Sequence, residues 1–119
     1  MRPDFKNLLV WQQAHDLTLA IYRATKLFPV EERFGLTNQI RRAVVSIESN
    51  IAEGNSRHTT KDFVQFLYIA RGSLAEIESQ LLIAKDLGYL DLSIFEEVSY
   101  KRTSVNKLLN LLIKKLSIS

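Results

Sequence analysis

The stretch Ser46–Arg57, SIESNIAEGNSR, closes the most regular pattern in the chain and decides its fold class. Reading back from it, apolar or small residues recur alternately four and three positions apart, the spacing of one packed face of a helix. The members of this pattern are Leu36, Ile40, Ala43, Ile47, Asn50 and Gly54. Two of them are unusual, because Asn50 is polar and Gly54 weakens a helix by about 1 kcal/mol relative to Ala. They mark either a binding site or a close contact between helices.

Two helices are predicted up to the end of this stretch. From Val10 to Phe28 apolar residues keep the same four-three spacing, and the proline that follows disfavours further helix. The segment Pro29–Gly35, PVEERFG, predicts a single helical turn with the proline at its first position. The pattern that includes SIESNIAEGNSR then predicts a second helix from about Phe34 to Glu53.

Two further helices are predicted after it. Thr59–Asp62 resembles a capping box, and the apolar spacing behind it continues to Ala84. Gly88 suits a left-handed C-terminal cap, and Ser93–Glu96 offers a second capping box before a pattern that reaches Leu116. Because no alternating strand pattern competes, the sequence predicts an all-α fold: an antiparallel up-down-up-down four-helix bundle, as one domain over residues 1–119.

The composition is that of one compact domain. The chain has 119 residues, of which 46% are hydrophobic, and it contains no low-complexity run. The absence of cysteine removes disulfides, thiolate nucleophiles and the usual structural zinc sites. Near the N-terminus the longest uncharged stretch, Asn7–His15, is too short for a membrane span of about 20 residues. We expect a soluble, cytoplasmic protein with no membrane partner.

Metal chemistry is not expected. Di-metal sites in four-helix bundles use a Glu-x-x-His pair on each of two helices. In this chain Gln12 stands three residues before His15, and Asn55 stands three residues before His58. The oxygen and nitrogen ligands of such a site are therefore not at the required spacing.

A nucleophile or a phosphate-binding glycine loop is not indicated either. Ser46, Ser49 and Ser73 lie within helical periodicity rather than on a strained turn with a base in reach. The four glycines of the chain are isolated from one another. We therefore expect a protein that is not an enzyme, with no catalytic residue, no metal and no cofactor.

Small residues around Gly54 and in IARGSLAE, Ile69–Glu76, predict that two helices cross closely. A buried, unpaired amide costs about 1–3 kcal/mol, so Asn50 needs partners, for which Glu53 and Glu76 are the nearest plausible side chains. Such a polar group can fix the register of helices or of subunits. The residues to which we assign this structural role are Asn50, Glu53, Gly54, Gly72 and Glu76.

Five segments carry a resemblance to a known family. They are VWQQA (Val10–Ala14), FPVEERFGL (Phe28–Leu36), QIRRAVVSIESNIAEG (Gln39–Gly54), FVQFLYIARGSLAEIESQL (Phe63–Leu81) and LGYL (Leu87–Leu90). Together they resemble the four-helix bundle family encoded in intervening sequences of bacterial 23S ribosomal RNA genes. Members of the family often have Pro where this chain has Glu48, so the resemblance does not imply a kink in this helix.

The resemblance implies an assembly and a class of partner. The family is similar in fold to the accessory protein of diversity-generating retroelements, a basic homopentamer that associates with nucleic acid and a reverse transcriptase. The intervening-sequence proteins themselves have no established biochemical role. The residues add a separate indication, because apolar side chains off the packed faces predict exposed apolar surface. These are Leu19, Tyr22, Val44, Ile51 and Phe66. We expect a homo-oligomer, with a pentamer implied by the resemblance.

Basic residues gather in two parts of the sequence. The chain has 16 Lys and Arg against 13 Asp and Glu, and no acid follows Lys101. The predicted contact residues are Arg41, Arg42, Arg57, Lys61, Arg71, Lys101, Arg102, Lys107, Lys114 and Lys115. A cationic surface neutralises phosphates without choosing a sequence, which favours binding to structured RNA or DNA. The alternative is a structural protein–protein interaction module, in which the same charges serve solubility and the partner is a protein.

Overall fold

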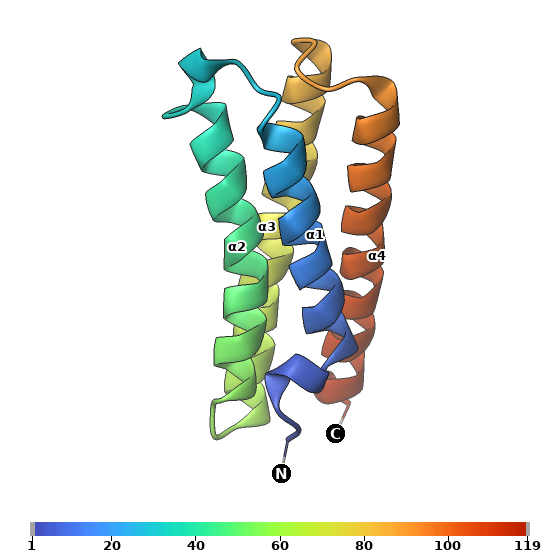
Figure 1. Cartoon of the computed structure of the whole chain (residues 1–119). Helices are drawn as coiled ribbons and strands as arrows, with labels where there is room; N and C mark the ends of the chain where they lie inside the picture. Colours follow the sequence, from blue (N-terminus) through green and yellow to red (C-terminus); the bar gives the residue numbers. More distant parts are fainter. Residues whose placement is uncertain (1, 119) are drawn as a thin grey trace.

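The computed structural model describes residues 2–118 and shows four long helices packed side by side (Figure 1). The long helices are α1 (Leu9–Thr25), α2 (Leu36–Asn55), α3 (Thr60–Asp86) and α4 (Leu92–Ser117), and the short 3-10 helices are η1 (Phe5–Asn7) and η2 (Val30–Glu32). Successive long helices run in opposite directions, and residues 2–118 contain no strand. The predicted all-α, up-down-up-down four-helix bundle is confirmed.

Both termini and the turn between α2 and α3 lie at one end of the bundle, which we call the termini end (Figure 1). The segment that contains η2 and the turn between α3 and α4 lie at the opposite end, which we call the far end. The molecule measures 45 × 24 × 20 Å. Residues near positions 2, 57 and 115 therefore lie in the same half of the molecule, although they are far apart in the sequence.

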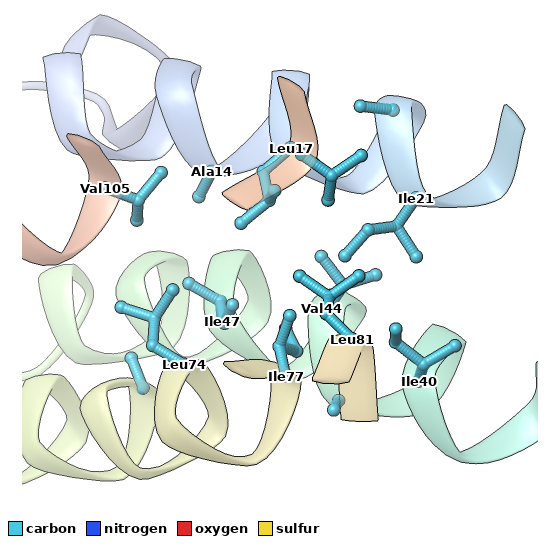
Figure 2. Close-up of a cluster of buried hydrophobic side chains, with 14 of the residues drawn as sticks. Ala14, Leu17, Ile21, Ile40, Val44, Ile47, Leu74, Ile77, Leu81 and Val105 are labelled. Carbon is cyan, nitrogen blue, oxygen red and sulfur yellow. The ribbon is translucent and has the colours of Figure 1, made fainter. Parts of the chain in front are cut away.

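The core is built by all four long helices, with the most extensive pairing between α2 and α3. Figure 2 shows aliphatic side chains from the four helices pointing toward one another. Among them are Ala14, Leu17, Ile21, Ile40, Val44, Ile47, Leu74, Ile77, Leu81 and Val105, each at most 2% exposed. This cluster supplies most of the hydrophobic stabilisation of the bundle.

The prediction of exposed apolar surface is partly wrong. Val44 and Ile51 are 0% exposed. Helix α2 packs against both α1 and α3, so it buries a wider face than the single packed face that the four-three spacing predicts. Leu19 and Tyr22 are exposed, as predicted, and Phe66 is half-buried. Val44 and Ile51 therefore do not belong to the exposed apolar surface, whereas Leu19 and Tyr22 do.

The helix ends follow the predicted signals in two of three places. The Thr59 hydroxyl accepts a hydrogen bond from Asp62 N at 3.1 Å, and Gly88 has φ 78°. The prediction that Ser93 caps α4 is wrong, because the Asp91 carboxylate accepts from Ile94 N at 2.8 Å instead. Asp91 closely follows the glycine turn, and its charge also suits the positive end of a helix.

Glu32 caps α2 from outside the helix, a contact that the sequence did not reveal. Its carboxylate accepts hydrogen bonds from Leu36 N at 3.1 Å and from the Tyr89 hydroxyl at 2.8 Å. These two bonds, in that order of importance, lower the pKa of the Glu32 carboxyl below its ordinary 4.5. Glu32 therefore ties the start of α2 to the α3–α4 turn at the far end.

Gly54 lies where α2 and α3 pack closely against each other, as predicted. A Cβ at this position would lie 2.7 Å from the Phe66 Cβ and 2.9 Å from the Phe63 Cδ1. The corresponding prediction for Gly72 is wrong, because a Cβ there would meet nothing within 4 Å. Gly72 is exposed, since the face of α3 that packs on its neighbours runs through residues such as Ala70 instead.

The polar contacts of α2 also differ from the prediction. Asn50 is half-buried, and its amide donates to the carbonyl and hydroxyl oxygens of Ser46 at 2.7 and 3.0 Å. The Ser46 hydroxyl lies 3.1 Å from that of Ser73 across the α2–α3 contact. Glu53 and Glu76, the predicted partners, are both exposed and do not bond Asn50, because an acceptor one turn away on the same helix is closer. A role of Asn50 in register stays a prediction.

Alanine substitutions at the two glycines should have opposite effects on stability. Gly54→Ala places a methyl against Phe66 and Phe63 and should cost about 1–3 kcal/mol of unfolding free energy, as overpacked cores do. Gly72→Ala adds a better helix former in open space and should gain up to about 1 kcal/mol. Urea unfolding followed by circular dichroism measures both. Equal stabilisation by the two variants would contradict the close contact at Gly54.

The cap at Glu32 should make stability depend on pH in acid. A carboxylate with a lowered pKa contributes stability that is present above pH 4.5 and is lost as the pH falls through its folded pKa. Glu32→Gln removes the charge, so its melting temperature should lie below that of the wild type at neutral pH, and the gap should narrow in acid. Glu31→Gln, at an exposed neighbouring position, is the control. A gap that stays constant from neutral to acid pH would refute the role given to Glu32.

Candidate nucleic-acid interface

The predicted contact residues do not form one continuous surface. Arg41 and Arg42 lie on α2 toward the far end, whereas Arg57 and Lys61 flank the α2–α3 turn at the termini end. At 1.5 Å per residue, Arg42 and Arg57 are separated by roughly 22 Å along the bundle. These basic residues, predicted around the second helix and the turn into the third, are therefore spread along the bundle, because α2 runs the length of the molecule.

Lys101 and Arg102 are engaged within the bundle. The Lys101 Nζ lies 2.6 Å from the Asp16 Oδ2 of α1. The Arg102 side chain is only 11% exposed, and its Nη2 lies 3.1 Å from the Glu78 Oε2 of α3. Both cations hold α4 against its neighbours and have little charge left for phosphate. They therefore do not belong to the candidate interface.

Arg41 and Arg71 are held against aromatic rings. The Arg41 guanidinium lies 4.6 Å from the Tyr22 ring centroid, and its Nε donates to the Thr25 hydroxyl at 2.8 Å. The Arg71 guanidinium lies 4.7 Å from the Tyr68 ring centroid. These contacts fix the orientation of both guanidinium groups while other N–H donors stay open to solvent.

Five of the predicted cations are unengaged. Within residues 2–118, these exposed side chains make no ion pair, hydrogen bond or ring contact: Arg42, Lys61, Lys107, Lys114 and Lys115. All but Arg42 lie in the half of the molecule that contains the termini end. They are therefore the side chains most available to an anionic partner.

Acidic residues concentrate at the opposite end. The far end carries Glu31, Glu32, Asp86, Asp91, Glu96 and Glu97 around η2 and the α3–α4 turn. Near the termini end the acids are mostly engaged, since Asp4 pairs with Lys6, and Glu53 pairs with Arg57 at 3.0 Å. The excess positive charge of the chain is thus concentrated in one half of the bundle.

A hollow opens at the termini end, lined by Arg2, Asn55, Arg57 and His58. The Arg2 Nη1 donates to the backbone oxygens of Asn55 and Arg57, and the Asn55 amide donates to the Pro3 oxygen at 2.9 Å. These bonds fasten the N-terminal segment to the end of α2. No local pattern in the sequence indicates that Arg2 belongs to this site, because more than fifty positions separate it from its partners.

A second hollow lies between α1 and α2 and is largely apolar. Leu19, Tyr22 and Val45 line it, with His15 and Glu48 also contributing. The His15 Nδ1 lies 3.1 Å from the Glu48 carboxylate, and the imidazole stacks on Trp11 at 5.0 Å. This surface offers shape and apolar area rather than charge, which suits contact with protein.

The described part of the chain offers neither a metal cluster nor a membrane-spanning helix. No group of three or more His, Asp or Glu side chains in residues 2–118 is placed to hold a metal ion. None of the helices described combines the length and apolar character that crossing a bilayer requires.

Comparison with known proteins identifies relatives of the whole bundle. The sequence model of the family described as "23S rRNA-intervening sequence protein" matches residues 6–111. A crystal structure of a protein of unknown function from the S23 ribosomal protein family of Bacteroides thetaiotaomicron VPI-5482 superposes with a TM-score of 0.83. It is 27% identical, and the match covers 89% of this chain and 99% of that one. No curated protein matches the sequence significantly. Neither description names a reaction.

Proposed function

This chain belongs to the 23S rRNA-intervening sequence protein family, and from that premise we propose that it is a non-catalytic, cytoplasmic homo-oligomer that binds structured RNA or DNA. The observation that carries the proposal is the set of unengaged cations in the half of the bundle with the termini end. In that half the proposed contact residues are Arg57, Lys61, Arg71, Lys107, Lys114 and Lys115, and Arg41 and Arg42, which lie toward the far end, are left out.

The character of the surface favours contact with phosphates over contact with bases. Lys and Arg that neutralise phosphates release counterions, which gives salt-sensitive and sequence-tolerant affinity. Stacking of unpaired bases requires open aromatic faces. Here Arg71 covers one face of Tyr68, Arg41 covers one face of Tyr22, and the exposed Tyr100 stands apart. A duplex or a folded RNA, recognised by its backbone and shape, is the best match.

Assembly would multiply this surface. The apolar hollow between α1 and α2 leaves Leu19, Tyr22 and Val45 exposed in the single chain. Burying such side chains between copies would bring several cationic halves into one particle. Linked sites of low individual affinity then gain avidity for a single polynucleotide. The pentamer implied by the family resemblance is our proposed state.

The second candidate function is a protein–protein interaction module. The same apolar hollow favours it, because the hollow could receive a different protein as readily as a second copy. In that case the cations would serve solubility, and binding to nucleic acid would be weak at every salt concentration.

Removal of three unengaged lysines tests the proposed function. Lys107/Lys114/Lys115→Ala should weaken binding to an RNA hairpin and to duplex DNA of unrelated sequence alike. The plot of log affinity against log salt should flatten by roughly 0.7–0.9 for each phosphate that the variant no longer neutralises. Filter binding or fluorescence anisotropy at several salt concentrations measures both effects.

The matched control is Arg23/Lys26/Lys85→Ala, which removes the same charge toward the far end. It should change affinity and slope much less than the lysine variant does. Equal losses from the two variants would show that net charge alone acts. No binding by the wild type at low salt would leave the interaction module as the better account.

A further inference from the structure

The hollow at the termini end brings together two arginine side chains and a histidine from three segments. Arg2 comes from the N-terminal segment, Arg57 follows the end of α2, and His58 lies in the turn before α3. Among residues 2–118, no carboxylate lines this hollow. Lys61 lies on the first turn of α3, three residues beyond His58, and within the described part of the chain its side chain makes no ion pair, hydrogen bond or ring contact. The electrostatic character of the site is therefore that of an anion receptor.

Both guanidinium groups are held in place by the packing at Gly54. The Arg2 guanidinium lies 4.8 Å from the Phe63 ring centroid, and that of Arg57 lies 4.7 Å from the Phe66 ring centroid. The Phe66 Cβ and the Phe63 ring are also the atoms that a Cβ at Gly54 would meet most closely. Both phenylalanines are therefore positioned by the α2–α3 contact. The cations are thus oriented before any ligand arrives, which lowers the entropy lost on binding.

Unused donors remain on both arginines. Arg2 spends its Nη1 on backbone oxygens of the turn, and Arg57 spends its Nη2 on Glu53. A guanidinium carries five N–H donors, so each arginine keeps others for a ligand. His58 is exposed, and its ring nitrogens make no hydrogen bond or ion pair with any of the residues that the structure describes. Several donors of positive or neutral groups can therefore converge on the oxygens of one ligand.

The backbone around the hollow is engaged in bonds of its own. The carbonyl oxygens at the end of α2 already accept bonds: that of Glu53 from Ser56, and those of Asn55 and Arg57 from Arg2. The turn then enters α3, where the Thr59 hydroxyl accepts from Asp62 N and the Asp62 carboxylate lies in the first turn. The positive character of the hollow therefore comes from its side chains.

We propose that this hollow binds a phosphate group of a nucleic-acid strand, with Arg2, Arg57 and His58 donating to its oxygens and Lys61 adding charge. The assignment rests on the proposed function and specifies one contact point within the broader cationic surface. A terminal phosphate monoester and an internal phosphodiester share this chemistry. This site differs from the lysines of α4 because its binding depends on the orientation of the side chains. A planar guanidinium donates two parallel N–H bonds to a phosphate, whereas a lysine acts as a point charge.

Substitutions within and outside the hollow separate a built site from general charge. Arg57→Gln and His58→Ala change exposed side chains and leave the core untouched. Arg2→Lys keeps the charge and removes the planar fork. Each should reduce affinity for a 5′-phosphorylated RNA hairpin about tenfold or more, the loss expected for a charge-assisted hydrogen bond. Lys114→Ala, which removes one charge in the same half of the molecule, should cost about twofold or less.

The same hairpin with a 5′-hydroxyl identifies the source of the phosphate. A selective loss of affinity when the 5′-phosphate is absent assigns the site to a terminal monoester. Equal wild-type affinity for both hairpins, still weakened by the hollow variants, assigns it to an internal phosphodiester. If the hollow variants lose no more affinity than Lys114→Ala, the site is overturned while the proposed function stands.

Inorganic phosphate alone tests the hollow without RNA. Titration of the wild-type protein, followed by NMR of the His58 ring and the arginine Nε–H groups, should shift the signals of Arg2, Arg57 and His58 and leave that of Arg23, on α1 toward the far end, unchanged. If the wild type binds no RNA at low salt but shows these shifts, the proposed function fails and the phosphate site survives. If the shifts are also absent, the site is overturned as well.

Discussion

The close approach of α2 and α3 at Gly54 is the constraint on which the rest of the structure depends. A methyl group has no space there, since Phe66 and Phe63 lie 2.7 and 2.9 Å from where its carbon would be. This contact sets the α2–α3 pairing, the most extensive in the bundle, and places the turn that follows α2. The same two rings support the guanidinium groups of Arg57 and Arg2. One packing constraint therefore shapes both the core and the hollow at the termini end.

Local signals in the sequence were sufficient for the architecture. The four-three spacing predicted four helices, and Thr59 and Gly88 marked two helix ends that the structure confirms. The errors in burial arose where a residue's neighbours come from another element, whereas the Asp91 cap and the Ser46 partner of Asn50 are local contacts that the sequence analysis missed. Val44 is buried because α2 has helices on two sides, and Gly72 is exposed because its face of α3 has none. Periodicity identifies a packed face but does not give its width.

In the candidate site, too, local sequence signals do not give the contacts between distant segments. The basic residues of the sequence do not reveal by themselves that Arg102 is paired and nearly buried, whereas Lys114 is exposed and unengaged. Nor do they single out Arg2, which reaches the hollow only because the N-terminal segment folds against the end of α2. The charge pattern of the sequence predicts nucleic acid as the partner, and the fold determines which cations are exposed to it. Ion pairs within the bundle leave the excess positive charge concentrated in one half.

The central claim is that nucleic acid meets the half of the bundle that carries the termini end. Hydrogen–deuterium exchange with mass spectrometry, comparing the free protein with its complex with a structured RNA, tests this claim directly. The account predicts slower exchange in peptides covering residues 2–8, 53–64 and 105–118, with no change in residues 26–36 and 86–97 of the far end. Protection confined to the far end, or to the apolar hollow between α1 and α2 (residues 15–22 and 41–49), would contradict it.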